Sequence, residues 1–465
     1  MSYTTIDRPT DYFRTKLYSG ENNSQSITFD ESDNMSPDWV WIKSRNGSGR
    51  NHCLYDSVRG VNKRLESDNT IAENSTSDQL TSFDTNGFTI GIGEADINSG
   101  GRTYASWNWL AGGTAPAITY SVKVVSDSGN KYRFDDFGTS AVTLDLQEGG
   151  TYTFDQSDSS NSGHPLRFST TSDGSHGGGS EYTTGVTTTG TPGSAGAKTV
   201  ITVGSGVATL YYYCTQHSGM GGQANTNSTH GSSNFSGSIQ ANVSANTTAG
   251  FSIVSYTGTG SNATVGHGLG AEAKMIIFKD RDTAAEWRVY HVGSGNTGAL
   301  DFNTSDAIQT NSVFFQDTTP TSSVFSLGTG TDVNNNTKNF IAYCFADTGN
   351  KFFKAGSYSG NGSSTNGTFV YTGFKPAFVM GKYINGTGDW YLWDNKRLGY
   401  NRDNNKIKPN TSDAETTEDW FDMYSNGFKF YNNSGDFNYG GYNFIYMAIA
   451  ESPFVTSTGI PTTAR

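Results

Sequence analysis

The sequence combines scarce charge with abundant glycine and aromatic residues over 465 residues, a length that allows several domains. Only 16 % of residues are charged, whereas 57 are Gly, 28 Phe, 25 Tyr and 8 Trp; this indicates a β-rich protein with many turns, not a helical enzyme or a disordered chain. The net charge of −12 and the lack of any apolar run near the roughly 20 residues of a membrane span argue against nucleic-acid binding and membrane insertion.

In chain order, residues 1–14 are predicted to be an N-terminal docking segment, and a repeated unit follows it. Each copy opens with a tyrosine and a glycine-containing turn, continues with a strand that ends in lysine, and closes with an apolar strand. Because these landmarks keep their order and near-constant spacing, we predict three copies of one fold. The opening segments are "LYSGENNSQ", "SYTGTGSNA" and "SYSGNGSST"; the lysine strands are "DWVWIK", "KMIIFK" and "AFVMGK"; the closing strands are "YASWNWLA", "FIAYCFA" and "FIYMAIA".

Short apolar runs separated by turn signals such as "TNG" and "SNG" make up each copy, and no stretch sustains a helical apolar period. We therefore predict an all-β protein built of tandem antiparallel β-sandwich or jelly-roll domains. The alternating "DWVWIK" predicts a half-buried strand. The closing strand "FIYMAIA" is apolar on both faces and predicts a central strand.

Residues 116–245 do not follow the repeat pattern and are predicted to be an inserted domain. The segment "GHPLRF" carries His164 at a loop-to-strand step, and the strand "ATLYYYC" leads into Cys214. Together with His217 and Met220, Cys214 forms the pattern C-x2-H-x2-M. A thiolate, an imidazole and a thioether suit copper better than zinc. Residues 171–197 have the composition of a flexible loop, in which we expect His176 to be exposed to solvent.

This order of strands and ligands resembles the cupredoxin family of blue-copper β-sandwiches, and the short ligand loop is most similar to the amicyanin type. The resemblance covers residues 116–245. It implies a Greek-key β-sandwich that binds copper through His164, Cys214, His217 and Met220. One departure is Pro165, because the family often has asparagine after this histidine. No second redox centre is evident, so we treat metal binding separately from electron transfer.

The rest of the chain offers no catalytic motif, since neither G-x-S-x-G nor H-E-x-x-H is present, and we predict that the protein is not an enzyme. Asp56 and Asp394 follow aromatic strands, but His291 takes the same place in the middle copy. We therefore interpret all three as polar residues at strand ends. Cys53 and Cys344 lie in apolar runs and are predicted to be buried free thiols.

Tryptophans next to polar residues in the third copy suggest a second kind of site. Aromatic rings can stack on sugars while neighbouring polar groups bind the hydroxyls. An ordinary sandwich core is the alternative. The candidate glycan-binding residues are Trp390, Trp393, Asp394 and Trp420.

The segments "YSGNGS", "GFKPAFVM" and "NFIYMAIAESPF" resemble repeats in structural proteins of marine bacteriophages of the cyanophage and pelagiphage type. The resemblance implies a virion tail fibre or related appendage that forms a homotrimer. It also implies contacts with other tail or capsid proteins and adsorption to a host-surface glycan or protein. Two alternatives stay open: an appendage on the capsid surface or vertex, and a copper-binding redox protein.

The predicted organisation has five parts: a docking segment (1–14), a first β-sandwich repeat (15–113), a cupredoxin-like domain (116–245), a second repeat (250–349) and a third repeat (350–465).

Overall fold

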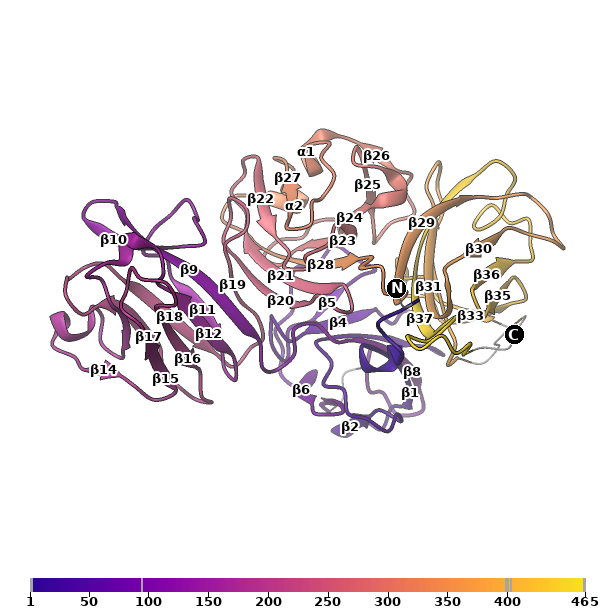
Figure 1. The fold of residues 1–465 in the computed structure, drawn as a ribbon. Coiled ribbons are helices and arrows are strands. Elements are labelled where there is room, and N and C mark those ends of the chain that lie inside the picture. The colour runs from indigo at the N-terminus through magenta and orange to yellow at the C-terminus, as the bar shows by residue number, and fades with distance from the viewer. Residues whose placement is uncertain (1–2, 93–94, 398–400, 402–403, 463–465) are drawn as a thin grey trace. The chain divides into compact units, whose positions relative to one another are not determined.

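The computed structural model describes residues 3–92, 95–397, 401 and 404–462 (Figure 1). Almost all regular structure is β, and the α-helices of these residues are two short ones, α1 (Ser312–Phe315) and α2 (Thr331–Asn334). The all-β prediction is therefore confirmed. The chain divides into two compact units: Met1–Ala111 with Ala245–Ala263 and His267–Arg465, and Gly112–Ser244 with Thr264–Gly266. We call them the repeat unit and the inserted unit, and we describe each by itself.

Repeat 1 places a five-stranded sheet, in the order β1-β8-β3-β4-β5, against a three-stranded sheet in the order β2-β7-β6. A hydrophobic cluster that includes Val40, Ile42 and Phe88 fills the space between the two sheets. The elements are η1 (Pro9–Asp11), β1 (Phe13–Ser19), β2 (Gln25–Thr28), β3 (Trp39–Ser44), β4 (Cys53–Asp56), β5 (Leu65–Glu66), β6 (Leu80–Asp84), β7 (Gly87–Ile90) and β8 (Thr103–Trp109).

Repeats 2 and 3 have the same principal sheet. In repeat 2 the strands run in the order β21-β28-β23-β24-β25-β26, and in repeat 3 in the order β29-β37-β31-β32. The strand "FIYMAIA" lies within β37, between two partners, so its prediction as a central strand is confirmed. The elements are β21 (Phe251–Thr257), β22 (Ala263–Gly266), β23 (Ala273–Asp280), β24 (Arg288–His291), η4 (Val292–Ser294), β25 (Gly298–Asp301), β26 (Gln309–Thr310), β27 (Val324–Leu327), β28 (Asn339–Ala346), β29 (Phe353–Ser359), β30 (Phe369–Tyr371), β31 (Phe374–Tyr383), β32 (Trp390–Asp394), β33 (Asn404–Lys406), β34 (Thr416–Glu418), β35 (Phe421–Tyr424), β36 (Gly427–Phe430) and β37 (Asn443–Pro453).

The inserted unit contains two five-stranded sheets, in the orders β10-β9-β12-β16-β15 and β11-β18-β17-β13-β14, together with the paired strands β19 and β20. Most neighbours are antiparallel, but β12 pairs with β9 and β11 with β18 in parallel. The elements are β9 (Ala117–Ser126), β10 (Asn130–Phe134), β11 (Leu144–Gln147), β12 (Thr151–Asp155), η2 (Ser159–Asn161), β13 (Leu166–Ser169), η3 (Gly174–Gly177), β14 (Glu181–Tyr182), β15 (Val186–Thr189), β16 (Lys198–Thr202), β17 (Leu210–Cys214), β18 (Gly222–Asn227), β19 (Ser232–Asn234) and β20 (Ala241–Asn246).

The alternation in "DWVWIK" has a different meaning from the one predicted, because every residue of β3 is buried. Val40 and Ile42 face the core inside repeat 1. Trp39 and Trp41 belong to a second core to which all three repeats contribute. The two faces of this strand therefore lie in two cores, and the expected solvent-exposed face does not exist.

The opening tyrosine of each copy has the same structural role. The hydroxyls of Tyr18, Tyr256 and Tyr358 donate to backbone carbonyls at 2.8, 2.6 and 2.9 Å. The acceptor residue is followed in each copy by a fully buried asparagine, which the comparison of the three copies by sequence did not identify. These residues are Asn98, Asn334 and Asn438.

Each buried asparagine holds the turn after the first strand of its repeat. In repeat 2 the Asn334 side chain accepts from the Thr259 N–H at 2.8 Å and donates to the carbonyls of Ser261 and Gly328 at 2.6 and 2.7 Å. The glycine of the opening motif is required by the same packing, since a Cβ at Gly258 would clash with the Asn335 carbonyl. Corresponding bonds and clashes occur in the other two copies.

The three repeats contact one another in a cyclic order, which we call the ring of repeats. The indole N–H of Trp287 in repeat 2 donates to the Glu66 carbonyl of repeat 1 at 2.7 Å. Trp390 of repeat 3 donates to the Asp301 carbonyl of repeat 2 at 2.8 Å. At the equivalent place in repeat 1, His52 Nε2 lies 3.0 Å from the Lys408 carbonyl of repeat 3, which completes the cycle.

Backbone bonds repeat this cyclic order. The N–H groups of Ala285, Gly388 and Arg50 donate to the carbonyls of Thr70, Ser305 and Ser412 at 3.0, 2.8 and 3.3 Å. The lysines that end the "DWVWIK"-type strands are buried beside these bonds, and their ammonium groups donate to backbone carbonyls. Burial lowers the pKa of each of the three to about 8; they are Lys43, Lys279 and Lys382.

We expect Asn334→Ala to destabilise the repeat unit by about 2–3 kcal/mol, because it leaves buried backbone groups without partners. All eight tryptophans lie in the repeat unit, so tryptophan fluorescence during denaturant unfolding reports on this unit alone. The exposed Asn336, two residues further on, is the matched control, and Asn336→Ala should change the free energy of unfolding by less than about 0.5 kcal/mol. Equal losses of stability in the two variants would show that Asn334 does not hold the turn.

Candidate metal centre

Three potential metal ligands converge at one end of the inserted unit. Cys214 is the last residue of β17, and its pairing partner in β13 is Leu166. His164 lies two residues before this partner, and His217 lies in the turn that follows Cys214. The Sγ atom of Cys214 is 3.8 Å from Nδ1 of His164 and 3.8 Å from Nδ1 of His217.

These distances fit a metal-coordination site. One donor atom from each of the three residues lies within 4.8 Å of the others. With metal–sulfur and metal–nitrogen bonds of about 2.3 and 2.0 Å, sulfur and nitrogen are about 3.7 Å apart at a 120° angle and about 3.5 Å apart at the tetrahedral angle. The observed separation is closer to the trigonal value, so His164, Cys214 and His217 could hold a metal ion.

Burial differs among the three ligands. Cys214 is fully buried, whereas His164 is half-buried and His217 is exposed. Loss of solvent, together with the neighbouring His217, lowers the pKa of His164. A lowered pKa favours the neutral imidazole, which is the form that binds a metal. The site thus has a buried thiol on one side and an imidazole at the surface on the other.

The backbone of His164 is held by three hydrogen bonds, although proline follows it. Its carbonyl accepts from the Tyr132 hydroxyl and from the Gln156 side chain, both at 2.9 Å, and its N–H donates to the Asn161 carbonyl at 2.8 Å. Burial, together with the nearby Cys214, raises the pKa of Tyr132, which keeps this hydroxyl a donor. His164 is therefore well anchored even though position 165 is proline and not asparagine.

Met220, the fourth predicted ligand, is 1 % exposed and belongs to the same hydrophobic core as Cys214. Its carbonyl accepts from the Tyr132 N–H at 3.0 Å, so both ends of the ligand loop are fastened to the unit. The thioether of Met220 stays a predicted ligand.

The segment expected to be a flexible loop instead contains η3, β14 and β15, and it contacts the ligand loop. Asp173 accepts from the Gly219 N–H at 2.9 Å, and His176 Nε2 lies 3.1 Å from the Cys214 carbonyl. Between them, Gly174 has a φ of 55°, and a Cβ there would clash with the Tyr213 ring. We call this segment, residues 171–182, the brace. The sequence did not reveal it, because its only signal is one aspartate and one histidine among glycines and serines. His176 itself is exposed, as predicted.

The candidate glycan residues require a correction. Trp390, Trp393 and Asp394 are only 1, 2 and 2 % exposed. Trp390 forms a bond of the ring of repeats, and Asp394 accepts from Arg397 and from the Trp107 indole at 2.6 and 2.9 Å. Trp393 packs on Phe421 inside repeat 3. All three residues are buried in these contacts and cannot offer a surface to sugars. Trp420 is half-buried, with the Lys406 ammonium 4.3 Å from its ring centre.

The polar residues interpreted as strand ends also have a larger role. Asp56 accepts from the Tyr343 hydroxyl of repeat 2 at 2.7 Å, and His291 Nε2 lies 3.0 Å from the Tyr446 carbonyl of repeat 3. Like Asp394, both lie at contacts between two repeats. Cys53 and Cys344 are buried free cysteines, as predicted.

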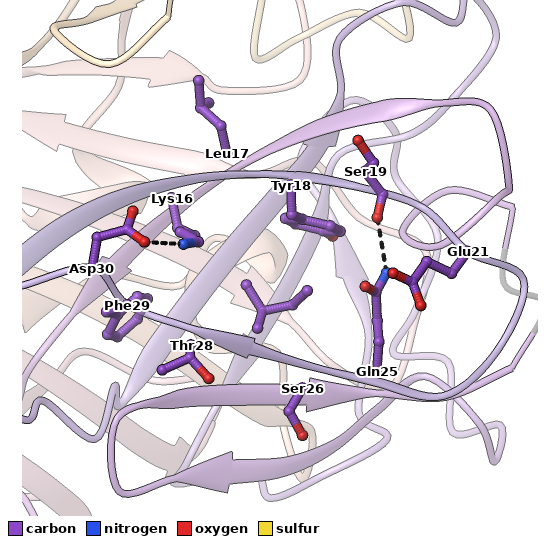
Figure 2. Close-up of a pocket in the computed structure, with 11 residues that line it drawn as sticks. Lys16, Leu17, Tyr18, Ser19, Glu21, Gln25, Ser26, Thr28, Phe29 and Asp30 are labelled. Atoms are coloured by element: carbon purple, nitrogen blue, oxygen red, sulfur yellow. Dashed lines mark hydrogen bonds and ion pairs between the residues drawn. The ribbon is translucent and has the colours of Figure 1, made fainter.

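A groove of about 480 Å³ lies beside β1 and β2 (Figure 2). Lys16 pairs with Asp30 at 2.5 Å across it, and Gln25 donates to the Ser19 carbonyl at 3.1 Å. Lys16 and Asp30 thus bond to each other and Gln25 bonds to the backbone, so these polar side chains are already engaged. Within the described residues, no helix has the length and apolar character needed to cross a membrane.

Comparison with known families gives one match, to the domain of unknown function DUF7483, over residues 8–135 and 224–453. The matched segments cover nearly all of the three repeats and both ends of the inserted unit, whereas all four predicted metal ligands and the brace at residues 171–182 lie between the two segments. No curated protein and no solved structure matches the chain.

We expect Asp173→Ala to weaken metal binding about tenfold, because it frees the ligand loop at Gly219 while leaving the ligands in place. Competition titrations with Cu(I) and Zn(II) on the full chain measure this affinity. Asp136→Ala removes an exposed aspartate elsewhere in the inserted unit, one that pairs with Lys123, and should leave the affinity unchanged. A similar decrease in affinity for both variants would assign the effect to charge and not to the brace.

Proposed function

The chain belongs to the DUF7483 family, and from its repeat motifs and the ring of repeats we propose that it is a structural and binding protein on the surface of a bacteriophage particle. The repeat motifs resemble those of marine phage structural proteins, and the ring of repeats is the observation that carries the proposal. Its tryptophans and buried polar groups are used to join the repeats. The outer surface of this all-β scaffold is not used in these contacts. Its three copies can therefore carry different surfaces, as a host-adsorbing appendage requires.

A tail fibre or related appendage is the form of this proposal that we favour, with the capsid surface or a vertex as the alternative position. Its partners would be other virion proteins and a host-surface glycan or protein. We also propose a homotrimer. Because one chain already satisfies the contacts between its repeats, trimer formation would use outer surfaces. The described part of the N-terminal segment packs into the repeat unit through Thr4 and Ile6, while Met1 and Ser2 lie outside the described residues.

Purified particles test the proposed location. We expect peptides of this chain in the proteome of gradient-purified phage, and antibody-gold labelling of the tail or head would distinguish the two positions. Pre-incubating host cells with the purified full chain should reduce phage adsorption severalfold, because the chain occupies the receptor. An equal concentration of serum albumin is the control. Absence of the chain from purified particles would refute the virion role.

A second candidate function comes from the metal centre. We propose that the inserted unit binds copper in a cupredoxin-like site, supported by the 3.8 Å spacing of Cys214 from each histidine. His164, Cys214 and His217, with Met220 as the fourth predicted ligand, would hold the ion, and the bound copper would supply a one-electron redox couple. Tyr132, Gln156 and Asp173 keep the ligands in position. Bound copper would then stabilise the inserted unit in the particle. The alternative is that the chain is a redox protein.

A copper titration of the full chain should produce an intense visible absorption band from thiolate bound to Cu(II), and Cys214→Ser should abolish it. Cys53→Ser removes a buried thiol in the repeat unit and should keep the band. Copper at about 100 times its Kd should stabilise the inserted unit by about 2.7 kcal/mol, measurable by calorimetry. A chain that gains neither colour nor stability would leave this unit without a copper function.

A further inference from the structure

We propose that the outer face of the β30-β36-β35 sheet in repeat 3 binds a neutral glycan; this rests on the proposed role in host adsorption and assigns it a surface. We call this face the aromatic face. It consists of Phe369 and Tyr371 on β30, Tyr424 on β35 and Tyr431 just after β36. Phe369 and Tyr371 are 43 and 58 % exposed, and both other rings are half-buried.

Three rings of the aromatic face contact one another across the strands, and the hydroxyl of the fourth, Tyr371, lies 3.4 Å from that of Tyr3. The ring centres of Phe369 and Tyr424 are 6.0 Å apart in an edge contact, and the hydroxyls of Tyr424 and Tyr431 are hydrogen-bonded. Phe369 extends over Gly427, where a Cβ would lie 2.8 Å from the ring. The glycine thus lets the Phe369 ring lie close to the sheet.

Repeat 1 provides an internal comparison because it builds the same sheet from different residues. In repeat 3, β30 pairs Phe369 with Lys429 and Tyr371 with Gly427. In repeat 1, β2 pairs Ser26 with Thr89 and Thr28 with Gly87. Both central strands begin at the glycine of an Asn-Gly turn, so Ser26 and Thr28 occupy the places of Phe369 and Tyr371.

The corresponding face of repeat 1 is polar and satisfied internally. Ser26 and Thr89 share a hydrogen bond of 2.8 Å, and Thr89 donates to Asp84, which takes the place of Tyr424, at 2.7 Å. The inner side is similar in both repeats, with Phe88 and Phe428 buried. Since the sheet forms with serine and threonine outside, the aromatic face of repeat 3 is not needed for folding and points to a ligand.

The size of the aromatic face fits a sugar better than a protein. An aromatic side chain offers about 150–250 Å², so four rings at these exposures present roughly 300 Å². A stable protein partner covers about 800 Å² on each side. A second copy of the chain would therefore need much more surface than this face provides, whereas a few sugar residues would cover it.

The polar groups around the rings indicate a neutral ligand. Lys429 lies opposite Asp422 in the strand register, so the two positions together carry one positive and one negative charge. The Lys429 ammonium also donates to the Asn366 side chain at 2.6 Å. Tyrosine hydroxyls, the Asn366 amide and the Lys429 ammonium can bind sugar hydroxyls, while the C–H face of a pyranose packs on the rings.

The test uses the full chain on a printed array of oligosaccharides, followed by calorimetric titration with the best neutral binder. We expect the double variant Phe369→Ser, Tyr371→Thr to bind at least tenfold more weakly. It copies residues that repeat 1 already carries on this frame, so tryptophan fluorescence should report an unchanged unfolding midpoint. Tyr439→Ser removes a tyrosine of repeat 3 that is 50 % exposed and lies outside the aromatic face; its affinity should stay within twofold of the native chain.

Three results would overturn the glycan proposal: no neutral oligosaccharide binds, the double variant binds as well as the native chain, or light scattering shows that the variant no longer self-associates whereas the native chain does. The last result would assign the face to a second copy. A chain found in particles but blank on the array refutes the glycan site alone. A chain that binds the array but is absent from particles refutes the virion role instead.

Discussion

The repeat unit depends on one interaction made three times: a ring nitrogen at the start of a strand bonds to a backbone carbonyl of the next repeat. Trp287, Trp390 and His52 make these bonds in a cycle that includes every repeat. Because the bonds lie among buried side chains, breaking one of them would leave a backbone carbonyl without a partner, at a high cost in stability. The packing of tryptophan and phenylalanine from all three repeats into one core follows from this arrangement. Removing one repeat would open the cycle at two places.

The three junctions between repeats use different chemistry on the same frame. Between repeats 1 and 2, Glu73 accepts from Arg59 and Arg281 at 3.2 and 3.0 Å. Between repeats 3 and 1, Glu415 takes the same part with Arg397 and Arg45 at 3.2 and 3.0 Å. Between repeats 2 and 3, Ile308 replaces the glutamate and Ile384 replaces the arginine of the neighbouring repeat. The Ile308 N–H donates to the Ile384 carbonyl at 3.0 Å, as the glutamate N–H does to the arginine carbonyl at the other two junctions. Buried ion clusters and well-packed apolar residues can be nearly equivalent in stability, so the frame, not the charge, is what the three junctions share.

The inserted unit obeys a different constraint. Its ligands are set by the pairing of β13 with β17 and by the turn after Cys214, and neither depends on the repeats. The family match includes both ends of the inserted unit but omits residues 136–223, and with them all four predicted ligands. The sequence of the repeats and the sequence of the metal centre can therefore change independently. The surface of each repeat can also change by itself, as the contrast between the aromatic face and its counterpart in repeat 1 illustrates.

Sequence by itself determined the all-β class, the three copies, and the Cys-His pattern of the metal centre, because strand alternation, repeated landmarks and ligand spacing are local properties of the chain. It did not determine what the aromatic strands face. "DWVWIK" reads as half-buried and Trp390 as either a sugar-binding or a core residue, yet both are buried, since their second face packs against another repeat. Nor did it identify Asn98, Asn334 and Asn438, or the brace at Asp173 and His176. Those roles exist only where distant segments meet, and only the tertiary structure decides which segments meet.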